Sequence, residues 1–338
     1  EEAKKRGAKI ICIDPRETRT AALSDWHIQP KPGTDAALAL GIMNEIVINR
    51  KHDLAFLKKH TTGYKEFLDK ILPKYTLDKV SRITGVKKAD IKQLAHEYGS
   101  TKKTYIRPNY GLNRHRNGGM MVRSIMLLPA ITGAWRNKSS GCFVGSIEEM
   151  WNVDLGKLQR PDLLDNKNPR SINMIQIGNA LNDKKLDPPI KSLFVWNSDI
   201  ANCAPDSISV RKGLKRKDLF TVVHETFWTD SCDYADIVLP ADTQLEHMDL
   251  HAPYGHYYFS LTQPAIKPLG ESKSNQDLFR DLAKYMGYKD KCFKESDESM
   301  IKNMIDPKHN PLFTGVTFEK LKKNGWVKGD VENKKRDY

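Results

Sequence analysis

The stretches IICIDPRETRTAALSDWHIQP at residues 10–30 and FTVVHETFWTDSCDYADIVLP at residues 220–240 share one internal plan. Each begins with an apolar run that ends in a carboxylate, Asp14 or Glu225. In both, a threonine follows four residues later and an aspartate eleven residues later, before a second apolar run. A carboxylate at the carboxyl end of a buried parallel strand is typical of sites that bind ribose hydroxyls or a purine edge. Two copies indicate two nucleotide-like groups, or one large cofactor with two nucleotide tails.

The loop that follows Asp14 carries further groups suited to a nucleotide. Arg16 and Thr18 could approach a phosphate, while Asp14 could accept hydrogen bonds from a ribose or from guanine N–H groups. An acid at a strand end can also simply cap the turn before a proline such as Pro15. The second copy of the pattern favours the binding interpretation.

The segment Pro32–Gly33–Thr34–Asp35 precedes a strongly predicted helix at residues 36–48. Gly33 would let a ligand approach the backbone closely, the free N–H groups at the helix start favour an anion, and Asp35 could bind a guanine edge. As a bare helix start, Thr34 or Asp35 is equally well explained by N-capping. The residues alone leave both interpretations open.

Two more polar segments are candidates for binding. The loop at residues 109–119 crowds two arginines, a histidine and three glycines before an apolar helix, and could contact a polar heterocycle or a substrate. The alternative is a solvated loop. The segment at residues 196–199 ends another predicted strand, and its short polar side chains suit a phosphate or a pterin edge as well as a simple turn.

His247 and His251 have the spacing of a zinc-binding helix, with His256 further along. The general-base glutamate between the pair is absent and Pro253 breaks the helix, so hydrogen-bonding histidines are favoured over a metal site formed by the protein. The motifs GxGxxG, GxxxxGK[ST] and GxSxG are absent from the sequence. Their absence disfavours a nicotinamide-type dinucleotide fold, a P-loop hydrolase and a serine hydrolase.

The composition is that of a globular protein, with 39% apolar and 29% charged residues among 338. No apolar run is long enough for direct membrane insertion. The five cysteines are scattered and never in CxxC spacing, which predicts reduced thiols, no local metal knuckle and a cytoplasmic location, or a periplasmic one if an export signal precedes Glu1. The net charge is +13, but no recognition helix or aromatic-interleaved basic stripe favours nucleic acid; some of the charge could face cofactor phosphates.

Alternation of strands and helices in both halves predicts an α/β fold with two doubly wound, mainly parallel-sheet domains related by pseudo-symmetry. The expected domains are residues 1–153, whose start looks truncated, and residues 154–290, followed by a polar extension at 291–338. The predicted strands are 9–14, 103–106, 192–196, 219–224 and 237–239, and the longer predicted helices are 36–48, 89–98, 120–133, 172–181, 207–213 and 276–286.

Five ordered segments together resemble the molybdopterin oxidoreductase family of the dimethyl sulfoxide reductase type. These are residues 7–21, 25–40, 109–119, 193–206 and 221–249. The resemblance runs to about Met286 and covers the middle of such an enzyme. It implies molybdenum, or tungsten, held by two molybdopterin guanine dinucleotides, one on each α/β domain. By this resemblance an iron–sulfur cluster would belong to an N-terminal part outside this chain, and the metal ligand would also lie outside this chain.

The resemblance also assigns residues. One guanosine diphosphate arm would be held by Asp14, Arg16, Thr18, Gly33, Thr34 and Asp35. The other would be held by Glu225, Thr229 and Asp236, with Asn197 and Ser198 lining a pterin or phosphate. Gly111, Arg114 and His115 would lie near the pterin–metal centre, and Arg114 and His115 are the candidates nearest the substrate. No catalytic residue and no metal ligand can be named in this chain.

Three departures from the family pattern stand out. Asp199–Ile200 replaces the usual Asn-Pro, which would place a carboxylate near phosphates and weaken that contact. Glu225 stands where many members have Asp, and Ser231–Cys232 where many have Thr-Ala.

The predicted function is therefore the central cofactor-binding region of an enzyme that performs two-electron oxo transfer or dehydrogenation on a small-molecule substrate. The electron-transfer partner cannot be read from the residues. We expect these 338 residues to be inactive alone. Two alternatives stay open: a non-redox hydratase on the same scaffold, and a nucleotide-binding or assembly protein without metal.

Overall fold

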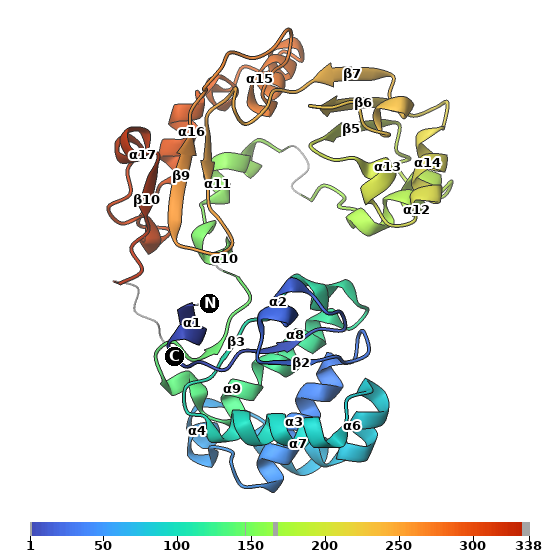
Figure 1. Cartoon of the computed structure of the whole chain (residues 1–338). Helices are drawn as coiled ribbons and strands as arrows, with labels where there is room; N and C mark the ends of the chain where they lie inside the picture. The colour runs from blue at the N-terminus through green and yellow to red at the C-terminus, as the bar shows by residue number, and fades with distance from the viewer. Residues whose placement is uncertain (1, 146, 165–167, 333–338) are drawn as a thin grey trace. The chain divides into compact units, whose positions relative to one another are not determined.

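The computed structural model describes residues 2–145, 147–164 and 168–332 (Figure 1). The chain divides into two compact units, Glu1–Val144 and Gly145–Asp337. Each unit has hydrophobic cores of its own. The division falls earlier in the chain than the boundary expected after residue 153.

Unit 1 combines two short parallel sheets with a group of packed helices. Strand β1 (Ile11–Ile13) pairs with β2 (Trp26–Ile28), and β3 (Tyr105–Ile106) pairs with β4 (Gly141–Cys142). The helices are α1 (Glu2–Lys5), α2 (Arg19–Leu23), α3 (Asp35–Ile48), α4 (Leu54–His60), α5 (Tyr64–Glu66), α6 (Leu77–Thr84), α7 (Lys88–Ser100), α8 (Gly118–Met126) and α9 (Leu128–Ile131).

Helix α3 is the centre of unit 1. Its sequence is apolar on nearly every side, and its residues from Leu38 to Ile46 are buried in the main core. Gly41 allows α6 to come close, because a Cβ atom there would lie 2.8 Å from a methyl group of Val80. The helix begins at Asp35, directly after the loop that follows β2. Burial of its body therefore fixes the position of Asp35 and of the loop before it.

Unit 2 contains a parallel sheet and an antiparallel sheet. The parallel sheet has the order β5 (Ser192–Trp196), β6 (Phe220–Glu225), β7 (Ile237–Pro240), and the antiparallel sheet has the order β10 (Trp326–Lys328), β9 (Tyr258–Thr262), β8 (Asp249–His251). The helices are α10 (Ile147–Met150), α11 (Leu155–Gln159), α12 (Ile177–Asn182), α13 (Ile200–Cys203), α14 (Ser207–Leu214), α15 (Asn275–Tyr285), α16 (Asp297–Met304) and α17 (Phe318–Asn324).

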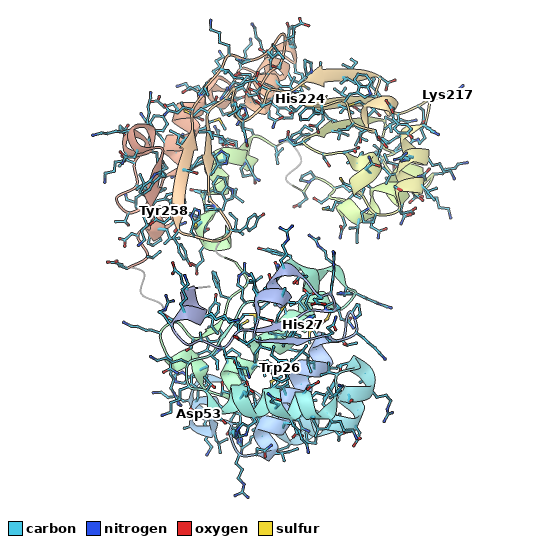
Figure 2. The ribbon with its side chains drawn as sticks, viewed as in Figure 1. Trp26, His27, Asp53, Lys217, His224 and Tyr258 are labelled. Carbon is cyan, nitrogen blue, oxygen red and sulfur yellow. The ribbon has the colours of Figure 1, made fainter. Side chains whose placement is uncertain are left out.

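Helices contact both faces of the parallel sheet, as a doubly wound fold requires. Leu193 of β5 packs with the core of α12, α13 and α14 on one face. On the other face Phe194 and Trp196 contact Phe279 of α15, with ring centroids 5.6 and 5.3 Å apart. His224, labelled in Figure 2, is fully buried and joins β6 to α15, since its Nδ1 lies 3.0 Å from Asn275 Oδ1. The predicted α/β class with parallel sheets is confirmed.

The segment expected to be a polar extension contains folded structure up to residue 332. Its residues contribute a large share of the second core of unit 2, which also covers β8 and β9. The buried apolar residues of this segment are Ile301, Leu312, Phe313, Val316, Phe318 and Leu321. They are spread over two short helices, a 3-10 turn and the connection at Val316, so no single stretch shows the periodicity that predicts an element.

Among the described residues, no helix combines the length and the apolar character needed to span a bilayer. All five cysteines are free thiols.

Candidate functional site

The sequence repeat is a structural repeat. In the first copy each residue of β1 pairs with the residue fifteen positions later on β2, as Ile11 does with Trp26. In the second copy β6 and β7 pair with the same offset, as Val222 does with Ile237. Both pairs are parallel, so the carboxyl ends of the strands meet at one edge of each sheet.

The repeated aspartates lie at the opposite edge from the repeated carboxylates. Asp25 Oδ2 accepts a hydrogen bond from the backbone N–H of Ile10 at 2.8 Å, and Asp236 Oδ2 accepts one from the N–H of Thr221 at 2.7 Å. Each aspartate N–H also donates to the carbonyl of the same partner, at 2.8 Å in both copies. Asp236 thus holds the amino end of β6, away from Glu225 at the carboxyl end. Strand geometry accounts for it, and we propose no cofactor contact for Asp236.

The repeated carboxylates hold the loops that follow their strands. Asp14 Oδ1 accepts from Arg16 N at 2.8 Å, and Glu225 Oε1 accepts from Thr226 N at 2.8 Å. Turn capping, the simpler interpretation, is therefore part of their role. In the described part of the chain the second oxygen of each carboxylate accepts no further hydrogen bond. That oxygen is available to a ligand at the strand edge.

Unit 1 brings four of the predicted site residues together. Gly33 has a φ of 78°, and a Cβ atom on it would lie 3.4 Å from His115 Nδ1, so the loop before α3 touches the loop at residues 109–119. Burial raises the pKa of the Asp35 carboxyl above its ordinary value. The negative charge of Asp14 raises it further, whereas the Asp35 backbone N–H and the nearby His115 act in the opposite direction. We call Asp14, Gly33, Asp35 and His115 the first site.

The remaining predicted residues of unit 1 surround this group. Thr18 caps α2 by accepting from Ala21 N at 3.2 Å, and Thr34 Oγ1 donates to Lys31 O at 2.6 Å. Gly111 and Arg114 belong to the 3-10 turn that leads into His115. Arg16 is exposed.

His27 on β2, labelled in Figure 2, was not predicted. Its Nε2 lies 2.9 Å from the carbonyl oxygen of Asp14 and so fixes the strand end. The sequence offers one signal for this role, which is the position of His27 next to Trp26 on the strand that pairs with β1.

The second site lies in unit 2 at the carboxyl edge of β5 and β6. We define it by Asn197, Ser198, Glu225 and Thr229. Asn197 has a φ of 51°, a left-handed conformation that turns the chain sharply after β5. Thr229 is held in its loop, because its carbonyl accepts from Cys232 N at 2.9 Å.

Asp199 and Ser231, two departures from the family pattern, form one hydrogen-bonded pair. Asp199 Oδ1 accepts from Ser231 Oγ at 2.6 Å and from Ser231 N at 3.2 Å, while Asn202 Nδ2 donates to Oδ2 at 2.9 Å. Burial acts to raise the pKa of Asp199, but these hydrogen bonds and the charge of Arg211 outweigh it and lower the pKa. The carboxylate that was expected to disturb a phosphate contact is engaged inside the protein.

Arg211 of α14 extends this pair into a network. Its guanidinium donates to Asp230 Oδ2 at 2.8 Å, to Asn202 Oδ1 at 2.9 Å and to the carbonyl of Ala201 at 3.2 Å. Asp230 directly follows Thr229, and Asn202 follows Ser198 and Asp199 in the chain. The network therefore fixes the two loops of the second site against each other.

Replacing Ser231 by alanine is expected to destabilise unit 2 by about 1 kcal/mol at neutral pH, because Asp199 loses a hydroxyl donor. A carboxyl whose pKa is lowered by folding contributes stability above its ordinary pKa and loses it as the pH falls through the lowered value. The cost of the substitution should therefore shrink in acid. Urea unfolding at pH 7 and pH 3 measures it, with Ser192→Ala on the exposed start of β5 as control. An equal cost at both pH values would contradict the role given to Asp199.

The loop of the second site also carries two large aromatic residues that were not singled out. Phe227 and Trp228 are 76% and 71% exposed, and Trp228 Nε1 donates to Asp233 Oδ1 at 2.8 Å. In the sequence these two aromatic residues stand between the strand-end acid Glu225 and Thr229. That position could have identified them as part of the loop at the second site.

The three histidines of the metal-like motif have separate partners, and only His251 lies on a strand. His247 bonds to Asp242, His251 lies on β8 with its Nε2 3.2 Å from Thr262 Oγ1, and the ring of His256 contacts that of Tyr258. Within residues 2–145, 147–164 and 168–332, no cluster of three or more His, Cys, Asp or Glu could hold a metal ion.

The model of one protein family, described as molybdopterin oxidoreductase, matches residues 1–285. The chain belongs to the molybdopterin oxidoreductase family. The family predicted from the five ordered motifs is thereby confirmed.

Individual members of the molybdopterin oxidoreductase family are similar over nearly the whole chain. The probable oxidoreductase YoaE of Bacillus subtilis (strain 168) is 45% identical over 335 residues, which are 98% of this chain and 48% of that protein. The dimethyl sulfoxide reductase DmsA of Escherichia coli (strain K12) is 31% identical, over 96% of this chain and 44% of its own length. The chain spans about half the length of these relatives.

A solved structure shares the fold. Acetylene hydratase from Pelobacter acetylenicus superposes with a TM-score of 0.76 at 25% sequence identity, covering 97% of this chain and 49% of that one.

Proposed function

We propose that this chain is the central cofactor-binding region of a molybdopterin oxidoreductase, and that each unit binds one guanine dinucleotide arm of a bis-molybdopterin guanine dinucleotide with molybdenum or tungsten. The observation that carries the proposal is the duplicated strand pair. Both copies have the same register, the same aspartate at the amino edge and a strand-end carboxylate at the carboxyl edge. The repeated aspartate serves the strand, and the repeated carboxylate at the carboxyl edge supports one nucleotide arm in each unit.

The first site fits a guanine-bearing ligand. Within the described residues, the only hydrogen bond assigned to the Asp35 carboxylate comes from its own backbone N–H, although the group is partly buried and burial raises its pKa. Two parallel N–H donors on a guanine edge would satisfy this carboxylate. Gly33 leaves the space beside His115 that a Cβ atom would restrict. A partly buried carboxylate with free acceptor capacity beside a glycine turn makes the site a candidate for a ligand with N–H donors.

The residues divide into two sets. Asp14, Arg16, Gly33 and Asp35 would hold one guanosine diphosphate arm, and Glu225, Thr229, Asn197 and Ser198 would hold the other. The cofactor, when bound, supplies the two-electron chemistry, while the protein positions it and sets its electrostatic surroundings. Arg114 and His115 would orient groups near the substrate. The excess of positive charge suits a ligand with several phosphates.

For the whole protein we propose oxo transfer or dehydrogenation of a small molecule. Its relatives include proteins named dimethyl sulfoxide reductase and F420-dependent formate dehydrogenase. A non-redox hydratase is the second candidate, and the similarity to acetylene hydratase favours it. The two differ in one observable property, because only the redox enzyme needs an electron donor or acceptor for turnover.

The decisive experiment is anaerobic purification of the full-length protein, followed by metal analysis and pterin fluorescence. We expect one molybdenum or tungsten and two pterins for each protein chain. Two pterins with turnover that needs no electron acceptor or donor would establish the hydratase. A protein that contains neither metal nor pterin, but binds guanosine diphosphate, would replace the proposal with a nucleotide-binding or assembly role.

A further inference from the structure

A histidine–carboxylate pair lies beside the second site and is not used above. His247 Nδ1 is 2.9 Å from Asp242 Oδ1. The Asp242 side chain is 5% exposed, whereas that of His247 is 23% exposed. The carboxylate is thus buried behind the ring, and the ring keeps an open side.

The backbone attaches this pair to the carboxyl edge of the parallel sheet. Ala241 N donates to the carbonyl of Glu225 at 3.1 Å, and Thr226 Oγ1 donates to the carbonyl of Asp242 at 3.4 Å. Asp242 N donates in turn to Lys273 O at 3.1 Å. Asp242 is therefore fixed next to the strand-end acid of the second site, and His247 is fixed by Asp242.

The chemistry of the pair determines which ring nitrogen faces outward. An ionised carboxylate only accepts hydrogen bonds, so Nδ1 must carry the proton that points to Asp242. Nε2 is then the acceptor on the open side of the ring. Glu246 beside the pair is occupied, since it accepts from Thr243 N at 2.7 Å and Leu269 N at 2.8 Å. His247 alone of these three groups presents an oriented atom to a ligand.

We propose that His247 is a further binding residue of the second site, and that Asp242 is the positioning residue that sets its tautomer. His247 Nε2 bonds a ribose hydroxyl or a phosphate oxygen of the nucleoside diphosphate arm held by Glu225. This inference rests on the proposed function, because it requires a nucleotide arm in unit 2. It adds to that site a side chain on the loop after β7.

The test measures the tautomer and the binding of guanosine diphosphate by the whole chain. The background variant Asp35→Asn weakens the first site, so that the second site is measured by itself. Imidazole ¹⁵N NMR of the free protein should show His247 with its proton on Nδ1, and guanosine diphosphate should shift the Nε2 resonance. His247→Ala should weaken binding about fivefold, His247→Gln should recover part of it, and Asp242→Asn should both reverse the tautomer and weaken binding.

His251→Ala is the matched control. His251 lies in the same unit on β8 and bonds to Thr262, so its removal should leave binding unchanged. If guanosine diphosphate binds in unit 2 while the Nε2 resonance stays fixed, or if His247→Ala binds as tightly as the background, the inference is overturned and the proposed function stands. If unit 2 binds no guanosine diphosphate at all, the proposed function fails and the inference fails with it. The NMR measurement needs no variant at His247, so a folding defect in His247→Ala leaves the test intact.

Discussion

Replacing Asp35 by asparagine is expected to weaken binding of guanosine diphosphate to the first site by about 30-fold, equivalent to about 2 kcal/mol. A carboxylate accepts two charge-assisted hydrogen bonds from the N–H groups of a guanine edge. An asparagine offers one acceptor and places an NH₂ group against the other donor. Isothermal titration calorimetry with guanosine diphosphate measures the loss, and adenosine diphosphate, which lacks this donor pair, should bind both proteins equally weakly.

The same substitution is expected to stabilise the free protein at neutral pH. Burial raises the pKa of Asp35, so the folded state holds the proton more tightly than the unfolded state does. Stability therefore falls as the pH rises from the ordinary pKa of aspartate through the raised value, and the full cost is present at pH 7. Asparagine carries no charge and avoids this cost. The stabilisation should vanish when both states are protonated, below the ordinary pKa.

Asp90→Asn is the control, since Asp90 also lies in the first turn of a helix of unit 1, α7. It corrects for the interaction of a first-turn acid with the helix dipole. Urea unfolding at pH 7 and at pH 3, below the ordinary pKa of aspartate, gives the two differences. A loss of stability at pH 7 beyond that of Asp90→Asn would show that the Asp35 carboxylate already has a partner inside the protein, and unchanged nucleotide binding would remove Asp35 from the site.

The elements that position the two sites follow from local sequence. The strands β6 and β7 and the start of α3 were predicted to within one residue, because the apolar runs there end at an acid or a proline and the helix follows a Pro-Gly turn. The strand β2 was noted only as an apolar stretch and was not predicted as a strand. The antiparallel sheet of β8, β9 and β10 was not predicted. Its strands are three to five residues long, and β10 is separated from β9 by the three helices α15, α16 and α17. A pairing of that kind is decided by tertiary contacts, which no short sequence window contains.

The candidate sites, like the fold, combine features that could be predicted from the sequence with contacts that could not. The strand-end acids could be found from spacing, because a buried parallel strand places its last residue at an edge where ligands bind. The contact between Gly33 and His115 and the bond between Asp199 and Ser231 join segments far apart in the chain. The two repeated acids in each copy of the sequence pattern have different roles. Glu225 repeats Asp14 at the edge predicted to bind, whereas Asp236 repeats Asp25 because both strands need the same backbone partner at their amino ends.

Replacing Asp236 by alanine is expected to destabilise unit 2 by about 2 kcal/mol, because the buried N–H of Thr221 loses its side-chain acceptor. Thr221 is 1% exposed, so water cannot replace the carboxylate without opening the strand. Asp236→Asn keeps an acceptor oxygen and should recover most of the stability. The matched substitution Asp25→Ala in unit 1 should cost less, since the first strand is more exposed at Ile10.

Amide hydrogen exchange at Val222 and Val223 of β6 reports this change within unit 2. The fold should loosen at β6 while guanosine diphosphate binding by the folded protein stays the same, because Asp236 lies at the edge of the sheet opposite Glu225. The reverse result, unchanged exchange with a large loss of nucleotide binding, would make Asp236 a ligand-binding residue. It would also mean that the repeated aspartates bind the cofactor and do not serve the strands. The hydrogen bonds at the amino ends of the two strands would then not explain the repeat in either unit.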